Sequence, residues 1–193
     1  MTAPTPRPTD EELLRAAASG DEDAFLEIYR RHKDGIYRFA YRMTGSAEAS
    51  QDVTHTCFAS LLEFPRRFEP LRASLGTYLR AAARNQCLKE WRRGWRERAV
   101  GAGQELHRGH EVGPLDRLLD DERGRMVRDA LLSLAPLHRE VVVLVEYEEL
   151  DLATVAEIVG AEIGAVKVRL HRARKKLRRA LEAYMSGRVM AGK

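Results

Sequence analysis

The sequence lacks any long apolar run. Its most apolar stretch, Val141 to Val145, lies between Glu140 and Glu146, whereas a membrane-spanning helix needs about 20 mostly apolar residues. The N-terminal stretch MTAPTPRPTDEE is proline-rich and then acidic, with no apolar segment of the kind that directs secretion. We therefore expect a cytoplasmic protein with no membrane insertion.

Cysteine is also scarce. Only Cys57 and Cys87 occur, and neither belongs to a CxxC pair. Because disulfides are rare in cytosolic proteins, we interpret them as small core residues on two different helices, although a redox pair stays open.

Residue groupings typical of catalysis are missing as well. The six histidines are scattered, and no nucleophile with a neighbouring base and no glycine-rich phosphate loop is present. His107 and His110 lie close together, but no cysteine or carboxylate cluster accompanies them at metal-ligand spacing. The sequence therefore predicts no enzymatic activity, no metal and no cofactor.

The charge balance permits nucleic-acid binding without demanding it. The chain has 33 Lys and Arg against 29 Asp and Glu, a net charge of +4, and 44% hydrophobic residues, which suffices for a globular core. The position of the charges is more informative than their sum.

Helical periodicity runs through most of the chain and breaks once. Apolar residues recur at helical spacing from Phe25 to Leu88 and again from Leu115, whereas the stretch from Ala99 to Pro114 is glycine-rich and has no such pattern. The valine run could suggest a strand, but no partner strand is visible. We predict an all-α fold of two small helical bundles joined by a flexible linker, divided into an N-terminal extension 1–20, a first domain 21–98, a linker 99–114, a second domain 115–185 and a tail 186–193.

Several helix boundaries are marked by capping residues. Thr9 with Glu12 fits a capping box, Asp21 fits the start of a longer helix, and Gly45 followed by Ser46 ends that helix and starts the next. In this next helix we expect one inward face, which consists of Val53, Cys57, Phe58, Leu61 and Leu62. Pro136 fits the first position of a later helix.

The C-terminal segment LDLATVAEIVGAEIGAVKVRLHRARKKLRRALE has helix-turn-helix form. The first helix spans Leu152 to Val159 behind Asp151, Gly160 lies at the turn, and the second helix begins near Ile163. Its inward stripe is Val166, Leu170, Ala173, Leu177 and Leu181, and its other face is basic, with no acid between Ile163 and Leu181. The first turns of such a helix enter the major groove of DNA, so this segment predicts DNA binding.

An aromatic and basic loop, FPRRFEP, precedes a helix predicted from about Ser74 to Arg93. Phe64 and Phe68 stand beside Arg66 and Arg67, a combination that holds single-stranded bases by stacking and phosphates by charge. Core packing is the alternative for each aromatic; we favour it for Tyr78 and leave it open for Phe68.

Both halves resemble one family. The stretch PLHREVVVLVEYEELDLATVAEIVGAEIGAVKVRLHRARKKL resembles the fourth conserved region of extracytoplasmic-function (group-four) sigma factors. DEDAFLEIYRRHKDGIYRFAYRMTG, SAEASQDVTHTCFASLLEF and FEPLRASLGTYLRAAARNQCLKEWRR resemble successive parts of their second region. The resemblance covers residues 21–93 and 115–182. It implies a transcription initiation factor that binds RNA polymerase core and promoter DNA and, in this family, commonly an anti-sigma protein.

The resemblance also implies three sets of site residues. The polymerase-docking set is Asp52, His55, Thr56 and Phe58, where the family usually has Gln and Glu at positions 55 and 56. The minus-ten DNA set is Phe64, Arg66, Arg67, Phe68, Arg72, Ser74, Arg80, Arg84, Asn85 and Lys89. The minus-thirty-five DNA set is Gly164, Ala165, Lys167, Val168, Arg169, His171 and Arg172, where the family often has Ser at position 168.

Two other functions compete with that of a sigma factor. A polymerase-independent helix-turn-helix regulator would bind an operator as a dimer and sense a signal through its other domain, but the sequence shows no acidic phosphoacceptor pocket and no strand-helix alternation. A nucleic-acid hydrolase lacks the catalytic groupings named above. Addition of polymerase core discriminates, because only a sigma factor depends on it for promoter binding.

Overall fold

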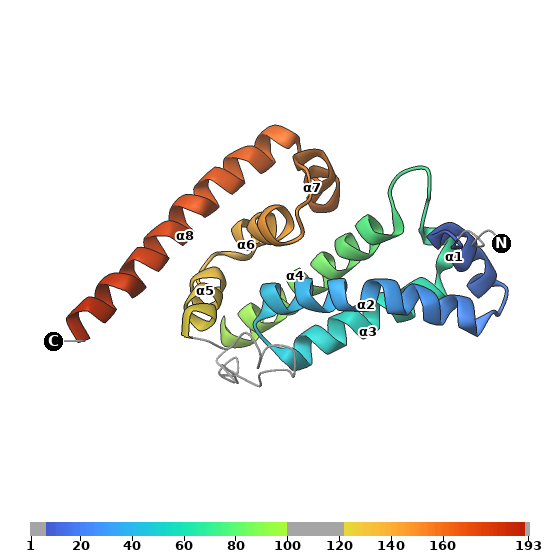
Figure 1. Cartoon of the computed structure of the whole chain (residues 1–193), viewed down its shortest axis with the longest axis horizontal. Helices are drawn as coiled ribbons and strands as arrows, with labels where there is room; N and C mark the ends of the chain where they lie inside the picture. The colour runs from blue at the N-terminus through green and yellow to red at the C-terminus, as the bar shows by residue number, and fades with distance from the viewer. Residues whose placement is uncertain (1–6, 100–121, 192–193) are drawn as a thin grey trace, which may run out of the picture.

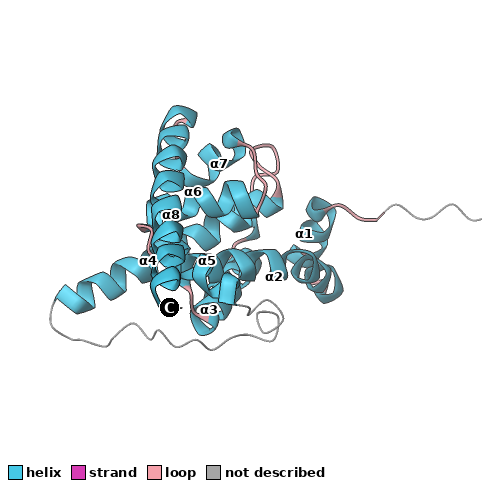
Figure 2. Ribbon diagram, turned by 60° about the vertical axis from the view of Figure 1, so that its left-hand side comes forward, coloured by secondary structure: helices cyan, strands magenta, loops and turns pink. Residues whose placement is uncertain are grey.

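The computed structural model describes residues 7–99 and 122–191 (Figure 1). The described chain consists of helices joined by short loops, and it contains no strand (Figure 2). The predicted all-α fold in two helical regions is therefore confirmed. Apart from Ala99, the predicted linker 99–114 lies outside the described residues, as do His107 and His110.

The first region contains α1 (Asp10–Ala18), α2 (Glu22–Thr44), α3 (Ala47–Glu63), the short 3-10 helix η1 (Pro65–Arg67) and α4 (Leu75–Ala99). Helices α2, α3 and α4 pack against one another, and α1 packs on α2 near its N-terminal end (Figure 1). Apolar residues of all three long helices form the core, with Ile28, Phe39, Phe58, Leu61 and Leu79 almost completely buried.

The predicted helix starts are confirmed by their hydrogen bonds. The Thr9 hydroxyl accepts from the Glu12 backbone N–H at 3.2 Å, and the Glu12 carboxylate accepts from the Thr9 N–H at 2.8 Å, which completes the capping box. Asp21 caps α2 through the Ala24 N–H, and Ser46 caps α3 in the same way. Local side-chain chemistry thus sets where these helices begin.

Gly45 ends α2 in a left-handed conformation, with φ of 73°. A Cβ at this position would stand 2.6 Å from Cδ1 of Leu132, the last residue of α5 (Glu122–Leu132). The backbone angle therefore favours glycine, and a side chain here would in addition force the end of the Leu132 side chain to shift.

The second region contains α5 (Glu122–Leu132), α6 (Pro136–Val142), the π-helical turn η3 (Val143–Tyr147), α7 (Leu152–Val159) and α8 (Ile163–Ala191). The valine run is helical, as predicted, with Val141 to Leu144 at most 1% exposed. Pro136 is the first residue of α6. Helix α8 reaches Ala191, so it continues into the stretch 186–193 that the sequence assigned to a tail.

The two regions lie against each other. Helix α4 contacts α6 and α7, and α2 contacts α5, α6 and η3, so α6 lies between α4 and α8 (Figure 1). Buried apolar residues of both regions form one continuous cluster. The sequence predicted the two bundles but did not predict this packing.

Both cysteines lie in the core, as predicted. Cys57 and Cys87 are free and buried, and burial raises the pKa of each thiol to about 12. A thiol with so high a pKa is rarely ionised at neutral pH and reacts slowly. No described helix combines the length and apolar character that crossing a membrane requires.

Candidate nucleic-acid interface

Helix α4 presents a row of polar and basic side chains next to an apolar stripe. Leu75, Leu79 and Ala83 recur every four residues and are buried in the first region. Ser74 starts the helix by accepting from the Thr77 N–H at 3.2 Å. The predicted contact residues lie outside the stripe: Arg80, Arg84, Asn85 and Lys89.

The loop before α4 divides its two phenylalanines between surface and core. Phe64 is 38% exposed, and the Arg67 guanidinium lies 4.0 Å from the centre of its ring. Phe68 is buried and meets the Tyr78 ring edge-on at 5.6 Å between centroids. Phe64 thus lies at the surface beside a cation, whereas Phe68 anchors the loop in the core.

The exposed face of α3 carries three of the four predicted docking residues. Asp52, His55 and Thr56 are exposed and share one side of the helix. Phe58 is only 2% exposed and packs edge-on against Tyr29. A docking role that places Phe58 on the exposed face is therefore wrong for this structure, because the apolar ring completes the core instead.

Helices α7 and α8 form the predicted helix-turn-helix. The Asp151 carboxylate accepts from the backbone N–H groups of Thr154 and Ala153, which with the Thr154 hydroxyl lowers the pKa of Asp151. Gly160 ends α7 with φ of 64°, and α8 begins at Ile163. Each of these boundaries agrees with the prediction.

The first turns of α8 separate buried from exposed residues clearly. Val166, Leu170 and Ala173 are at most 5% exposed and pack inward. Six of the predicted contact residues face solvent: Gly164, Ala165, Lys167, Val168, His171 and Arg172. Arg169 is partly covered, with its side chain 33% exposed.

Glu140 and Glu148 of the second region pair with arginines of α4. Glu140 is completely buried, and its carboxylate accepts from Arg84 Nε at 2.8 Å and Nη2 at 3.3 Å. Arg169 Nη1 lies 3.7 Å from the same carboxylate. Glu148 accepts from Arg80 Nε at 3.1 Å, and Arg42 Nη1 lies 3.4 Å from its other oxygen.

Burial and charge act in opposite directions on Glu140. Removal from water raises the pKa of its carboxyl group, and the hydrogen bond and charge of Arg84, then the charge of Arg169, lower it. Burial is the largest of these effects, so the pKa stays raised. The ionised carboxylate therefore depends on its arginine partners.

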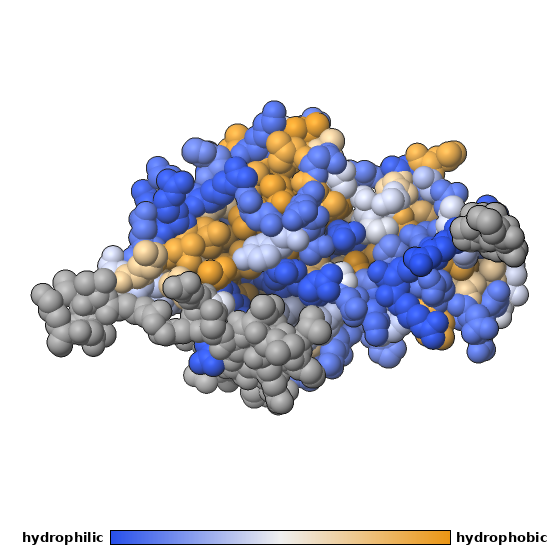
Figure 3. All heavy atoms as spheres, in the orientation of Figure 1, coloured by the Kyte–Doolittle hydropathy of each residue, from blue (hydrophilic) through white to orange (hydrophobic). Residues whose placement is uncertain are grey.

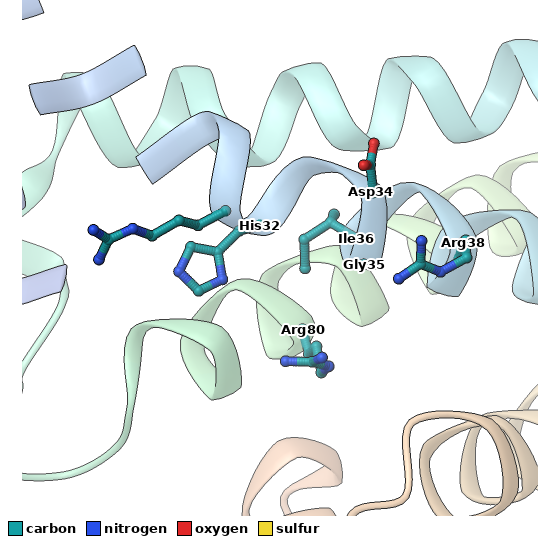
Figure 4. Close-up of a pocket in the computed structure, with 7 residues that line it drawn as sticks. His32, Asp34, Gly35, Ile36, Arg38 and Arg80 are labelled. Atoms are coloured by element: carbon teal, nitrogen blue, oxygen red, sulfur yellow. The ribbon is translucent and has the colours of Figure 1, made fainter. Parts of the chain in front are cut away.

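Basic residues of α2 continue the charged surface beside Arg80. A cavity of about 290 Å³ is lined by Arg31, His32, Asp34, Gly35, Ile36, Arg38 and Arg80. Figure 4 shows Arg80 extending from α4 into the space between α2 and the C-terminal ribbon. Asp10 pairs with His32 at 2.7 Å and with Arg31 at 3.1 Å, so α1 partly neutralises this surface.

Comparison with known proteins identifies the family. Residues 28–97 match the family model of sigma-70 region 2, and residues 124–177 match that of sigma-70 region 4. The ECF RNA polymerase sigma factor SigE of Mycolicibacterium smegmatis is 30% identical over 186 residues, which are 93% of this chain and 72% of that protein. This chain belongs to the ECF RNA polymerase sigma factors. SigW of Bacillus subtilis is 27% identical over 180 residues, 89% of this chain and 96% of that protein.

Two solved structures have a fold similar to that of this sigma factor. CnrH, solved in complex with the cytosolic domain of CnrY, has a TM-score of 0.67 and 24% identity, covering 90% of this chain and 97% of that chain. RpoE of Bartonella quintana, solved with the anti-sigma factor NepR, has a TM-score of 0.62 and 20% identity, covering 82% and 96%.

The family membership establishes the general function. This sigma factor is a DNA-binding transcription initiation factor, and the polymerase-independent regulator is not favoured. Its two family regions coincide with the two helical regions of the structure.

Sequence reasoning missed several residues of the interface. Glu140 and Glu148 were not singled out, although Glu140 directly precedes the apolar run Val141 to Val145, and an acid next to such a run is a visible signal of a buried, paired carboxylate. Leu71, fully exposed in the loop before α4, was also overlooked. Leu62 was expected inward but is 50% exposed beside the Asp52 face, which adds an apolar side chain to that surface.

Proposed function

We propose that this sigma factor reads the two promoter elements with separate surfaces and docks on RNA polymerase core with a third. The observation that carries the proposal is the solvent-facing basic row on the first turns of α8, directly after the Gly160 turn. Its position in a helix-turn-helix is that of a recognition helix.

The minus-thirty-five element is assigned to α8. Lys167 and Arg172 are exposed cations that fit phosphates. Val168 and His171 are exposed on the same turns, and we assign them to base edges. Phosphate contacts supply affinity and register, while base contacts supply specificity.

The minus-ten element is assigned to α4 and to the loop before it. Phe64 offers an exposed ring for stacking, and Arg66, Arg67 and Arg72 offer charge for a melted strand. Phe68 supports this surface from the core. Promoter melting is aided because stacked bases leave the duplex.

Docking on polymerase core is assigned to the α3 face formed by Asp52, His55, Thr56 and Leu62. This face is exposed and combines an acid, polar groups and an apolar side chain, a mixture found in protein interfaces. Because polymerase works on the chromosome, we place the protein in the cytoplasm. We assign it binding roles and no catalytic role.

An anti-sigma protein is a proposed further partner. Among the solved relatives, RpoE of Bartonella quintana is in complex with the anti-sigma factor NepR, and CnrH is in complex with the cytosolic domain of CnrY. The C-terminal helices show an apolar band (Figure 3) and carry exposed apolar side chains, among them Leu137, Tyr184 and Met185. Exposed apolar side chains of this kind mark protein contact sites.

Reconstitution with polymerase core tests the proposal. Random duplex fragments are selected for binding by the chain alone, by core alone and by the mixture, and the bound fragments are sequenced. We expect only the mixture to enrich fragments with two spaced motifs. Equal enrichment by the chain alone would contradict the proposal.

A further inference from the structure

The second region covers the arginines of α4 with its own carboxylates. Arg84 is held by Glu140 through two N–H groups, and its side chain is only 15% exposed. Arg80 donates to Glu148. The Arg80 side chain is 23% exposed and the Glu148 side chain is 6% exposed. Both arginines belong to the predicted minus-ten surface.

A carboxylate and a phosphate bind an arginine side chain through the same hydrogen-bond geometry. Each has paired oxygens that accept two parallel N–H bonds from the guanidinium fork. Glu140 therefore occupies on Arg84 the position that a backbone phosphate would take. The two cannot bind the same edge at once, because Nε and Nη2 of Arg84 donate to Glu140. The remaining Nη1 donates to Asn85, and the side chain is largely enclosed.

The same carboxylate also reaches the other DNA surface. Arg169 of α8 lies 3.7 Å from Glu140, so one buried acid engages an arginine from each predicted promoter surface. Arg42 of α2 adds to this contact, since its guanidinium lies 4.6 Å from the centre of the Tyr147 ring and 3.4 Å from Glu148.

Such a contact is suited to a switch rather than to permanent stability. Burying a charged pair removes both groups from water, and this penalty offsets most of their attraction. A competing anion or a partner that holds the regions apart can therefore open the contact with little free energy. Opening also returns Glu140 to solvent.

We propose that packing of α6, η3 and α7 on α4 is an autoinhibited state, in which Glu140 and Glu148 act as internal substitutes for DNA phosphates. The inference rests on the proposed assignment of Arg80 and Arg84 to promoter DNA. Promoter binding then requires separation of the two regions, and the acids withdraw as DNA takes their place.

The test compares DNA affinity of the full-length chain without polymerase. Fluorescence anisotropy measures binding to a fluorescein-labelled oligothymidine for wild type, Glu140→Gln and Glu148→Gln. We expect each variant to bind about tenfold more tightly, because the closed state is depopulated. Circular dichroism checks the fold, and Glu148→Gln decides the result if Glu140→Gln does not fold.

Two variants separate this effect from bulk charge. Glu146→Gln removes the same charge from the same segment, but Glu146 pairs with Arg174, which lies outside the predicted contact set; we expect no comparable gain. Arg42→Gln lowers the positive charge of the chain, but it also removes the ion pair between Arg42 of the first region and Glu148 of the second. We expect it to tighten DNA binding as well.

The outcomes distinguish the inference from the proposed function. If Glu140→Gln and Glu148→Gln bind no more tightly than Glu146→Gln, or if Arg42→Gln binds more weakly than wild type, the inference is overturned. Holoenzyme with Arg84→Ala tests the underlying assignment separately: unchanged promoter binding there would sink the assignment of Arg84, whereas weakened binding would leave it standing.

Discussion

Arg139, near the start of α6, donates to the backbone carbonyl of Met43, near the end of α2. The same guanidinium donates to the carbonyl oxygens of Leu132 at 2.5 Å and Leu134 at 3.0 Å. Burial lowers the pKa of Arg139 to about 10. One buried cation thus satisfies carbonyls at two helix ends and joins the two regions, since carbonyls at a helix C-terminus carry partial negative charge.

Replacement of this cation is expected to destabilise the fold. Arg139→Leu leaves three carbonyl groups, two buried and one partly buried, without this donor, so the free energy of unfolding should fall by about 2–4 kcal/mol. Urea denaturation followed by circular dichroism measures the loss. Arg30→Leu, on the exposed surface of α2, is the control and should have little effect; equal losses in both variants would refute the role given to Arg139.

The docking prediction concerns Asp52. Asp52→Ala removes an exposed charge without disturbing the core of α3, so the helical content should stay unchanged while affinity for polymerase core falls about tenfold. A pull-down with core and circular dichroism are run in parallel. Glu11→Ala removes an exposed acid from α1 and should leave core affinity intact. A folded Asp52 variant that binds core like wild type would disprove the docking assignment.

The helix-turn-helix should lose stability on acidification through Asp151. Its pKa is lowered by hydrogen bonds from Thr154, so the folded state favours the ionised carboxylate. The resulting stabilisation is present above the ordinary pKa of about 4 and is lost as pH falls through the lower folded-state value. Asn caps helices without titrating in this range. The melting temperature of wild type relative to Asp151→Asn should therefore drop below about pH 4, and a constant difference would contradict the prediction.

Sequence patterns predicted the local features of the fold because these features depend on neighbouring residues. The Thr9 capping box, the Gly160 turn and the inward stripe of α8 each follow from spacing within a few residues. Phe58 shows the limit: it matched a docking motif and an apolar stripe at once, and only the packing against Tyr29 shows that it is buried.

Contacts between the regions could not be predicted in this way. Arg84 and Glu140 are far apart in sequence, and no periodicity links them. Their pairing depends on how the two folded helical regions pack against each other. Arg84 of α4, which looked free for DNA in the sequence, is consequently covered in the structure, whereas Asn85 and Lys89 stay exposed. The contact residues on both DNA surfaces remain predictions that mutation must test.

On α8, Arg172 is predicted to supply affinity without specificity. It is an exposed cation placed to hold a phosphate, so Arg172→Ala should weaken all promoters to a similar degree and reduce the salt slope of binding by about one. Arg178, farther along the helix, should contribute only a slight, sequence-independent loss when it is replaced by alanine. Binding of each variant holoenzyme at several salt concentrations measures both slopes, and a sequence-selective loss in Arg172→Ala would count against a phosphate role.

His171 is predicted to read bases. It is exposed within the first turns of α8, opposite the buried Val166 and Leu170, where a side chain reaches base edges in the major groove. His171→Ala should change the preferred upstream promoter sequence, at roughly 1–3 kcal/mol for each altered base pair. Val168, 49% exposed, presents methyl groups that fit a thymine methyl, so Val168→Ser should change the preference at a neighbouring position. A promoter library bound by each variant holoenzyme measures both effects. If base preference is unchanged in both variants, this face of α8 does not read sequence.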